Sequence, residues 1–319
     1  MSEQYIFAFF SAISIPLVLL PSAWHWRSRN TGTLLYIGWV LVANITYFLN
    51  TVIWWDNTEN LAPVWCDICI KLQIGIAPGL LSASLCINRR LALISLSKSP
   101  SMSRRAARMN LIIELCLGLG LPAAIMAASY VVQPHRFDIA EGLGCFSQPY
   151  PVLAAVFLVL LWPVLLSFVS SGYVVAVSSF IRRRLQFSTF LKTNQSGLTT
   201  SRYLRLVALA TSDLLISLPL AIFYLVEFTQ HLSPWISFDW IHLDFHVVNA
   251  FDSTYMARNP DIATRLFLPR WLAPLSAIAF FAFFGLAEDA LADYVSIYER
   301  IRSYIVRPSQ LRNARIGQM

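Results

Sequence analysis

Seven apolar stretches, each long enough to cross a lipid bilayer, constrain the fold of this chain more than any other feature of its sequence. A membrane-spanning helix needs about 20 predominantly apolar residues, with a range of roughly 17–25. Only 13% of the residues are charged, whereas soluble domains carry roughly 25%. We therefore expect an all-α membrane protein, a seven-transmembrane helix bundle with helices near residues 5–24, 33–55, 66–88, 109–132, 150–181, 206–228 and 271–287.

The segments between these stretches alternate in charge. The first, third and fifth segments carry most of the lysines and arginines: Arg27, Arg29, Arg89, Arg90, Lys98, Arg104, Arg105, Arg108, Arg182, Arg183, Arg184, Lys192, Arg202 and Arg205. The second, fourth and sixth carry only Arg136, Arg258, Arg265 and Arg270. Because basic loops stay on the cytoplasmic side of a membrane, we expect a multi-pass plasma-membrane protein with its N-terminus extracellular and its C-terminus cytoplasmic.

The two ends of the chain agree with this orientation. A cleavable signal peptide begins with a basic region, whereas "MSEQYIFAFF" has Glu3 near its start and the basic cluster "HWRSRN" follows the apolar run. We therefore expect the first stretch to remain as a membrane helix, in a transmembrane domain over residues 1–290. In the cytoplasmic tail, residues 291–319, one helix face would carry Leu291, Val295, Tyr298, Ile301 and Ile305. This spacing predicts a short amphipathic helix.

The charge pattern also limits the possible partners. The side with few arginines carries most of the acidic residues of the loops: Asp56, Glu59, Asp67, Asp138, Glu141, Glu227, Asp239, Asp244, Asp252 and Asp261. An acidic mouth favours cationic or neutral ligands. The net charge of +7 arises on the cytoplasmic side, where arginines commonly serve only as topology signals and lipid anchors. We expect contacts with membrane lipids and no binding of nucleic acid.

Two of the five cysteines lie on the predicted outer side, where disulfides persist. We favour a disulfide between Cys66, at the start of the third helix, and Cys145, which precedes the fifth. Cys69 lies one turn below Cys66 and competes as the partner of Cys145, and free thiols are the other alternative. Cys86 and Cys116 are expected to be buried packing residues.

Three ionisable residues lie inside predicted helices, where such groups are functional candidates by default. Lys71 is roughly 7 Å inside the outer end of the third helix, at about 1.5 Å per residue. It either extends to the outer headgroups or faces a pocket. Asp213 and Glu114 are expected nearer the cytoplasmic side, in a polar network with Asn44 or Asn50.

The sequence argues against several classes of protein. The last predicted helix has no lysine, which excludes a retinal chromophore. "DWIHLDFH" places His242 and His246 four residues apart but lacks a convincing third ligand, so we expect no metal site and no cofactor. We find neither paired catalytic carboxylates nor an activated nucleophile within the helices, and therefore expect no enzyme. A transporter is less favoured because no internal repeat is evident.

Long stretches of the sequence resemble the fungal mating-pheromone receptors of the a-factor-receptor type, which are class D G-protein-coupled receptors. The similar segments include "WHWRSRNTGTLLYIGWVLVANITYFLNTVIWWDN", "APVWCDICIKLQIGIAPGLLSASLCINRRL", "HRFDIAEGLGC", "SRYLRLVALATSDLLISLPL" and "RWLAPLSAIAFFAFFGLAEDA". They extend from about residue 5 to about residue 290 and are most similar to the basidiomycete branch of the family.

The resemblance implies a receptor domain over residues 1–290 that binds a farnesylated peptide mating pheromone and activates a heterotrimeric G protein. The residues expected to bind ligand are Trp54, Trp55, Trp65, Asp67, Lys71, Phe137 and Glu141. The residues expected to couple to the C-terminus of Gα are Asn88, Arg89, Arg90, Arg182, Arg183, Arg184, Arg202 and Arg205. "INRRL" stands where rhodopsin-like receptors have an acidic-Arg-aromatic triplet, so their ionic lock is not carried over.

Glycines and prolines within the predicted helices are candidate switch hinges: Gly75, Pro78, Gly79, Pro219 and Pro274. Proline removes a helix hydrogen bond and permits kinking, although both residues are frequent in membrane helices. We expect ligand binding in the outer half to shift helices five to seven and to open a cytoplasmic cleft for Gα. The alternative is an orphan or constitutively active seven-helix receptor for another lipid or peptide.

Overall fold

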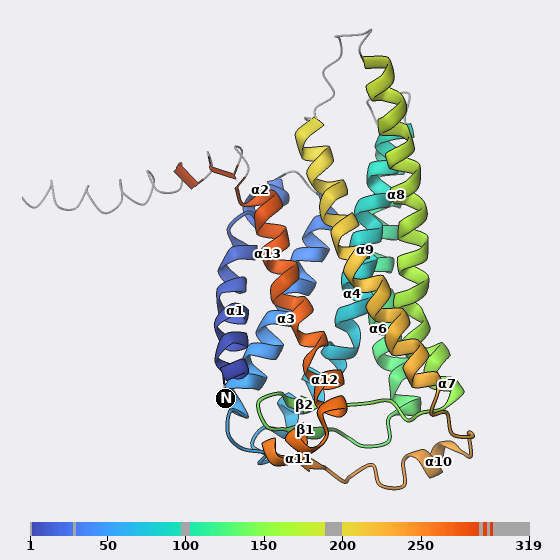
Figure 1. Cartoon of the computed structure of the whole chain (residues 1–319). Helices are drawn as coiled ribbons and strands as arrows, with labels where there is room; N and C mark the ends of the chain where they lie inside the picture. Colours follow the sequence, from blue (N-terminus) through green and yellow to red (C-terminus); the bar gives the residue numbers. More distant parts are fainter. Residues whose placement is uncertain are drawn as a thin grey trace, which may run out of the picture.

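The computed structural model describes residues 2–27, 30–96, 103–188, 200–286, 290–291 and 294–295. Over these residues the chain forms a bundle of long helices with a small sheet at one end (Figure 1). The amphipathic helix predicted within residues 291–319 falls almost entirely outside the described residues.

Six helical segments of the described chain are long and apolar enough to cross a membrane: Thr31–Ile53, Pro63–Leu93, Arg104–Val132, Leu153–Ser179, Leu204–Thr229 and Pro260–Phe284. Glu3–Leu19 is also apolar but shorter, so a seventh crossing stays a prediction. The last segment begins at Pro260, well before the predicted start near residue 271. Its first turns carry the charged residues Asp261 and Arg265, which interrupt the apolar pattern in the sequence.

The helices of the described chain follow one another with few long connections. The first four are α1 (Ser2–Leu19), α2 (Ser22–Arg27), α3 (Thr31–Ile53) and α4 (Pro63–Leu96). The next crossing combines α5 (Arg104–Leu115), η1 (Cys116–Gly120), α6 (Leu121–Ala128) and η2 (Ser129–Val132). After it come α7 (Leu153–Ala155), η3 (Val156–Leu160), α8 (Leu161–Ser188) and α9 (Thr200–Thr229). The rest are α10 (Phe238–Ile241), α11 (Ser253–Arg258), α12 (Pro260–Phe267), η4 (Pro269–Trp271) and α13 (Leu272–Phe284).

A proline accounts for one interruption in the helical hydrogen bonding. Pro122 has no N–H to donate to the carbonyl of Gly118, four residues earlier, and the widened π-helical turn η1 precedes α6 at this point. The Gly118 carbonyl instead accepts a hydrogen bond from Trp39 Nε1 at 2.8 Å. This bond joins α3 to the α5–α6 segment in the interior of the bundle.

Glycines let the helices around α4 approach closely, as is common in membrane bundles. A Cβ added to Gly79 would lie 2.3 Å from the ring of Trp39, and one added to Gly75 would lie 2.8 Å from Met126 Sδ. Trp39 itself belongs to the main core, which joins α3, α4, α9 and α13. The two glycines that the sequence offers as hinges are therefore tight packing positions inside a continuous α4.

A small sheet closes one end of the bundle. Strand β1 (Asp138–Ala140) pairs antiparallel with β2 (Gly144–Phe146) and parallel with β3 (Ala250–Phe251), in the order β2-β1-β3. Gly142 has a φ of 76° in the turn between β1 and β2, a backbone conformation that glycine adopts without strain. The prediction of an all-α fold is wrong here, because strands of two or three residues are too short to show an alternating pattern.

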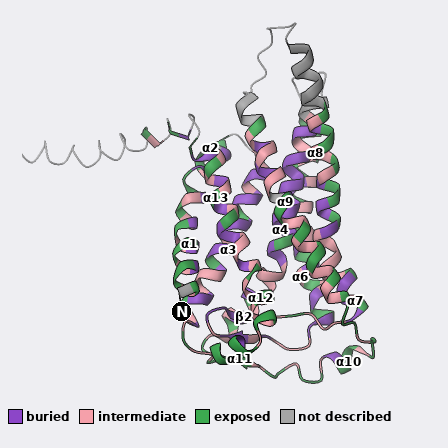
Figure 2. Ribbon diagram, viewed as in Figure 1, coloured by how far each residue is buried: buried purple, intermediate pink, exposed green. Residues whose placement is uncertain are grey.

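We call the end that carries this sheet the sheet end, and the end near Arg89 and Arg90 the basic end. The N-terminus of α1 lies at the sheet end, and the C-terminal end of α8 and the N-terminal end of α9 lie at the basic end (Figure 1). Many helix faces turned away from the bundle interior are exposed (Figure 2). They carry apolar side chains such as Leu215, 71% exposed, and Val175, 65% exposed, as expected for helices that contact lipid.

Candidate functional site

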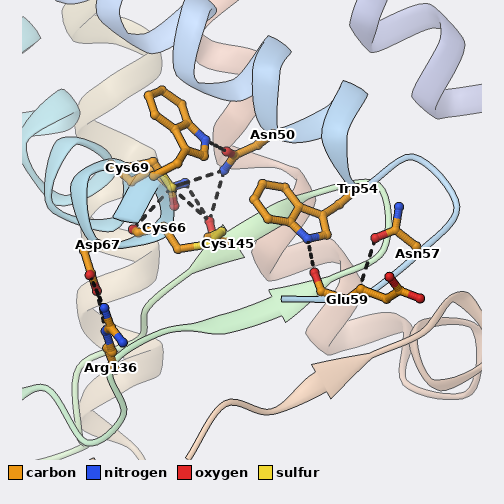
Figure 3. Close-up of a disulfide and its surroundings, with 11 residues drawn as sticks. Asn50, Trp54, Asn57, Glu59, Cys66, Asp67, Cys69, Arg136 and Cys145 are labelled. Carbon is orange, nitrogen blue, oxygen red and sulfur yellow. Dashed lines mark hydrogen bonds and ion pairs between the residues drawn. A yellow bond between two sulfur atoms is a disulfide. The ribbon is translucent and has the colours of Figure 1, made fainter. Parts of the chain in front are cut away.

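A disulfide at the sheet end joins Cys66, in the first turn of α4, to Cys145 in β2 (Figure 3). Their Cα atoms are 5.3 Å apart. Cys69, the alternative partner, is free and buried beside the bridge. Its thiol donates to the Cys66 carbonyl at 3.5 Å. The bridge fastens the loop between η2 and α7 to the start of α4.

Asn50 of α3 organises the groups around the disulfide (Figure 3). Its Nδ2 donates to the Cys145 carbonyl at 3.2 Å, and its Oδ1 accepts from Trp65 Nε1 at 2.8 Å. Gln73 Nε2 donates to the same Cys145 carbonyl at 2.8 Å. The prediction that Asn50 could join a network with Glu114 is wrong, because Asn50 lies at the sheet end and Glu114 is near Arg89 and Cys86.

Asp67 forms a two-point ion pair with Arg136 of the loop between η2 and α7 (Figure 3). Arg136 Nε donates to Asp67 Oδ1 at 2.8 Å, and a second guanidinium nitrogen donates to Oδ2 at 2.5 Å. The hydrogen bond to Asp67 raises the pKa of Arg136 above its ordinary value. The sequence identifies Asp67 but not this partner. The pairing offsets the negative charge that an acidic ligand site would have had here.

The Lys71 side chain is directed toward η2 and does not extend freely to the surface. Its Nζ donates to Ser129 Oγ at 3.0 Å and to Gln133 Oε1 at 2.7 Å. It also lies 5.7 Å from the centre of the Tyr130 ring. All of these groups are uncharged, so they satisfy the ammonium group without neutralising its charge.

Two loops lie over the sheet end: residues 133–152, between η2 and α7, and residues 230–259, between α9 and α12. We call these two loops together the cover. The backbone N–H of Arg136 donates to the Phe245 carbonyl at 2.8 Å. Asn249 donates to Asp138 Oδ1 from its backbone N–H at 3.1 Å and from Nδ2 at 3.0 Å. Glu141 accepts from the backbone N–H of Ser253 at 2.8 Å. Two loops distant in the sequence therefore form one structure held by backbone and carboxylate hydrogen bonds.

Arg270 joins this cover to α1 and to the last helical segment, and no sequence pattern other than its charge indicates this role. Its side chain is 1% exposed and donates to the Gly142 carbonyl and to Glu3 Oε1, both at 2.8 Å. The guanidinium carbon lies 4.1 Å from the centre of the Phe7 ring and 4.5 Å from that of Phe267. Arg270 thereby links three segments that are far apart in the chain.

The predicted aromatic ligand residues divide into buried and accessible groups. Trp54 and Phe137 are fully buried in one cluster with Cys66 and Cys145. Trp54 Nε1 donates to the Glu59 carbonyl at 2.8 Å (Figure 3). Trp55 and Trp65 are partly exposed. Trp54 and Phe137 therefore support the cover from the protein interior, whereas Trp55 and Trp65 are accessible from the surface.

At the basic end, side-chain hydrogen bonds connect α4 to neighbouring segments. Asn88 Nδ2 donates to Ser170 Oγ of α8 at 2.8 Å, and Arg89 donates to Asn110 Oδ1 of α5 at 2.8 Å. Arg90 donates to Asn30 Oδ1 at 3.4 Å. Arg205 is partly exposed. The other predicted coupling residues have side chains outside the described part of the structure: Arg182, Arg183, Arg184 and Arg202.

Four other predicted residues can be placed. Pro219 lies inside α9 and is exposed, and Pro274 lies near the start of α13 and is buried. Cys116 is exposed, so the prediction that it is a buried packing residue is wrong. It lies on the outer side of η1, where an apolar residue can contact lipid instead of protein. His242 contacts two backbone carbonyls, those of Phe238 and Tyr130, at 2.9 and 3.0 Å.

The apolar crossings and the disulfide-bound cover define a multi-pass helical membrane protein. A family model described as "Pheromone A receptor" matches residues 6–302. The chain therefore belongs to the pheromone A receptor family, which is a family of signalling receptors rather than of enzymes.

Individual relatives agree with this assignment. The chain is 36% identical over 296 residues to the pheromone B alpha 3 receptor of Schizophyllum commune, covering 92% of this chain and 47% of the relative. It is 32% identical over 296 residues to pheromone receptor 1 of Ustilago hordei, covering 91% and 82%. To the pheromone a factor receptor of Saccharomyces cerevisiae it is 27% identical over 298 residues, covering 91% and 61%. The chain thus spans about half the length of its Schizophyllum relatives.

Proposed function

We propose that this chain is a G-protein-coupled receptor that binds a farnesylated peptide mating pheromone and activates a heterotrimeric G protein from the plasma membrane. The observation that carries the proposal is the family match over residues 6–302. It is supported by relatives named as fungal pheromone receptors and pheromone a factor receptors.

The proposed orientation has the sheet end outside and the basic end in the cytoplasm. The disulfide supports an outer sheet end, because disulfides persist in oxidising compartments. Arg89 and Arg90 support an inner basic end through the positive-inside rule. We take α1, with 18 residues, as the seventh crossing. At 1.5 Å per residue it would be about 27 Å long, close to the roughly 30 Å core of a bilayer.

We propose that the peptide part of the ligand contacts Trp55, Trp65, Lys71 and Glu141 beneath the cover. Lys71 supports this assignment because its charge is not neutralised by the uncharged groups that it contacts. Its ammonium group can exchange one of these hydrogen bonds for a peptide carbonyl. Asp67 contributes through its fixed pair with Arg136, and Trp54 and Phe137 contribute by supporting the wall behind.

At the basic end, the proposed docking site receives the C-terminus of Gα. Its residues are Asn88, Arg89, Arg90, Arg182, Arg183, Arg184, Arg202 and Arg205. The hydrogen bonds of Asn88 and Arg89 can be exchanged for bonds to a partner, because the neutral bond of Asn88 contributes only about 1 kcal/mol net and the charged bond of Arg89 roughly 1.5–3 kcal/mol. Pro219 and Pro274 are the proposed hinges for this change. Pro78, Gly75 and Gly79 would act with them in α4.

The experiment that tests this function is GTP exchange on a fungal Gα, in membranes that contain the chain, with a panel of farnesylated peptides. The proposal expects at least one farnesylated peptide to stimulate exchange and its unprenylated counterpart to be inactive. The double variant Arg89→Ala, Arg90→Ala should bind the peptide normally and lose stimulated exchange.

A matched control removes two other positive charges from the basic end. Arg104→Ala with Arg105→Ala changes exposed residues at the start of α5 and should leave exchange intact. Equal loss in both double variants would show that overall charge, not the Arg89–Arg90 site, supports coupling. Stimulation by the unprenylated peptide alone would contradict the proposed ligand class.

A further inference from the structure

A groove between α9 and α12 lies apart from the disulfide cluster and from Lys71. It has a volume of about 340 Å³ and is lined by residues of these two helices, by Gln230 and by Leu268. Ligand sites in proteins usually have volumes of about 300–1,000 Å³. The groove therefore has room for one chain of a ligand rather than for a whole lipopeptide. We propose that it binds the prenyl chain of the pheromone; this inference rests on the proposed function.

The lining changes from apolar to polar along the groove. The apolar end is formed by Phe223, 54% exposed, and Leu268, 44% exposed, and the opposite rim by Gln230 and Asp261. Phe223 lies about 9 Å before the end of α9 at Thr229, at 1.5 Å per residue, and Gln230 directly follows that end. Because α9 approaches the sheet end at its C-terminus (Figure 1), the polar rim is the one nearer the cover. This gradient fits an amphiphile with its apolar chain toward the bilayer and its polar part toward the sheet end.

An ion pair spans the groove and holds its polar half together. Glu227 of α9 pairs with Arg265 of α12, and Tyr224 Oη donates to the Arg265 carbonyl at 3.2 Å. The Glu227 side chain is 16% exposed. Asp261 adds a second carboxylate at the rim against the single guanidinium of Arg265. The rim is thus net negative and complements an amine or a basic side chain of the attached peptide.

The cover explains why the prenyl chain would enter the groove from the lipid bilayer. At the sheet end, β1 is paired on both edges and is fastened through the Cys66–Cys145 bridge and Arg270. The groove opens instead beside exposed apolar residues such as Ile222 and Val226, a surface that a membrane helix presents to lipid. A prenyl chain already dissolved in the bilayer can reach it without crossing the cover.

The groove is also close to a candidate hinge. Phe223 is four residues, about one helical turn, from Pro219 in α9. A chain packed between Phe223 and Leu268 would favour the arrangement of α9 and α12 that accommodates it. The prenyl chain would therefore both contribute to affinity and favour one bend of α9 at Pro219.

The test uses a defined probe, farnesyl-cysteine methyl ester with a diazirine on the farnesyl chain, and the full chain in nanodiscs. After irradiation, labelled peptides are mapped by mass spectrometry. The inference expects labelling to concentrate in residues 222–230 and 260–268 and to be competed by unlabelled farnesyl-cysteine methyl ester. Leu268→Trp fills the apolar end and should lower labelling about tenfold, the change that corresponds to 1.4 kcal/mol of binding free energy.

Leu275→Trp is the matched control, because Leu275 is 49% exposed on α13 but does not line the groove. It should label like the unchanged chain. Both variants are compared for thermal unfolding, and Phe223→Trp is a second groove-filling variant if Leu268→Trp is unstable. Labelling spread evenly over all lipid-facing helices, or unchanged in both groove variants, would overturn the inference.

GTP exchange on Gα separates this inference from the proposed function. Stimulation by a farnesylated peptide that is the same in Leu268→Trp and in the unchanged chain would overturn the groove while leaving the receptor function in place. Groove labelling without stimulation by any farnesylated peptide would support the groove and contradict the receptor function.

Discussion

The two ends of the bundle are held together by different kinds of contact. At the sheet end, a disulfide, paired strands and the buried Arg270 join segments that are far apart in the sequence. At the basic end, Asn88, Arg89 and Arg90 make hydrogen bonds to the side chains of Ser170, Asn110 and Asn30. Contacts of the second kind are exchanged at small cost. We therefore expect the sheet end to keep its structure during signalling and the basic end to change.

The largest effect on stability should come from breaking the bridge with Cys145→Ser. The disulfide closes a loop with a sequence separation of 79, and its loss should reduce the free energy of unfolding by on the order of 2–4 kcal/mol. Thermal unfolding in detergent, with and without reductant, measures this. Cys116→Ser, which changes an exposed free thiol and keeps the bridge, should unfold like the unchanged chain and should still be destabilised by reductant, whereas Cys145→Ser should be insensitive to it.

Arg270→Met should have the next largest effect. Methionine can fill the apolar space beside Phe7 and Phe267, but it leaves the buried Gly142 carbonyl without its donor. We expect a loss of about 2 kcal/mol, measured by the same unfolding assay. Arg258→Met, at an exposed position of α11, controls for the loss of charge. Equal destabilisation by the two variants would show that Arg270 does not fasten the cover.

Gly79→Ala tests the packing between the two ends. The added Cβ would lie 2.3 Å from the Trp39 ring, and overpacking of this kind costs about 1–3 kcal/mol. Gly172 of α8 has no atom within 4 Å of an added Cβ, so Gly172→Ala should be neutral or slightly stabilising because alanine favours helix. Equal unfolding of the two variants would show that the contact between Gly79 and Trp39 does not hold α4 against α3.

The smallest stability effect, with the largest consequence for signalling, is expected for Ser170→Ala. It removes the acceptor of Asn88 Nδ2 and should lower stability by about 1 kcal/mol, while basal GTP exchange rises. Ser171→Ala removes a hydroxyl bonded within its own helix to the Ser167 carbonyl and should not change basal exchange. A fall in stability as large as that of Cys145→Ser would remove the contrast between the two ends.

Much of the bundle could be predicted because lipid imposes a long apolar run on every crossing. The predicted helix at residues 33–55 differs little from Thr31–Ile53. The helix predicted to end at residue 88 continues to Leu96 through Arg89 and Arg90. Charges mark where a helix leaves the membrane, whereas capping and hydrogen bonding decide where it ends. The helix predicted at residues 271–287 differs little from Leu272–Phe284, although the helical segment that leads into it begins at Pro260.

The candidate site was less predictable, because its contacts depend on loops folded over one end. Cys66 and Cys145 could be paired from their position on one side of the membrane. Arg136 and Arg270 could not be assigned partners, since Asp67 and Glu3 are distant in sequence and no local pattern links them. The strands that bring these residues together are two or three residues long, below the length at which alternation is visible.

The expected difference between the two ends during signalling is tested most directly by the distance between two spin labels at each end. This distance is measured with and without a farnesylated peptide that stimulates exchange. Nitroxides on non-canonical residues leave the cysteines intact. One pair replaces the exposed Met109 and Leu204 near the basic end, and the other replaces the exposed Val64 and Leu243 at the sheet end. The account predicts that peptide shifts the first distance and leaves the second unchanged. A shift confined to the sheet-end pair would contradict it.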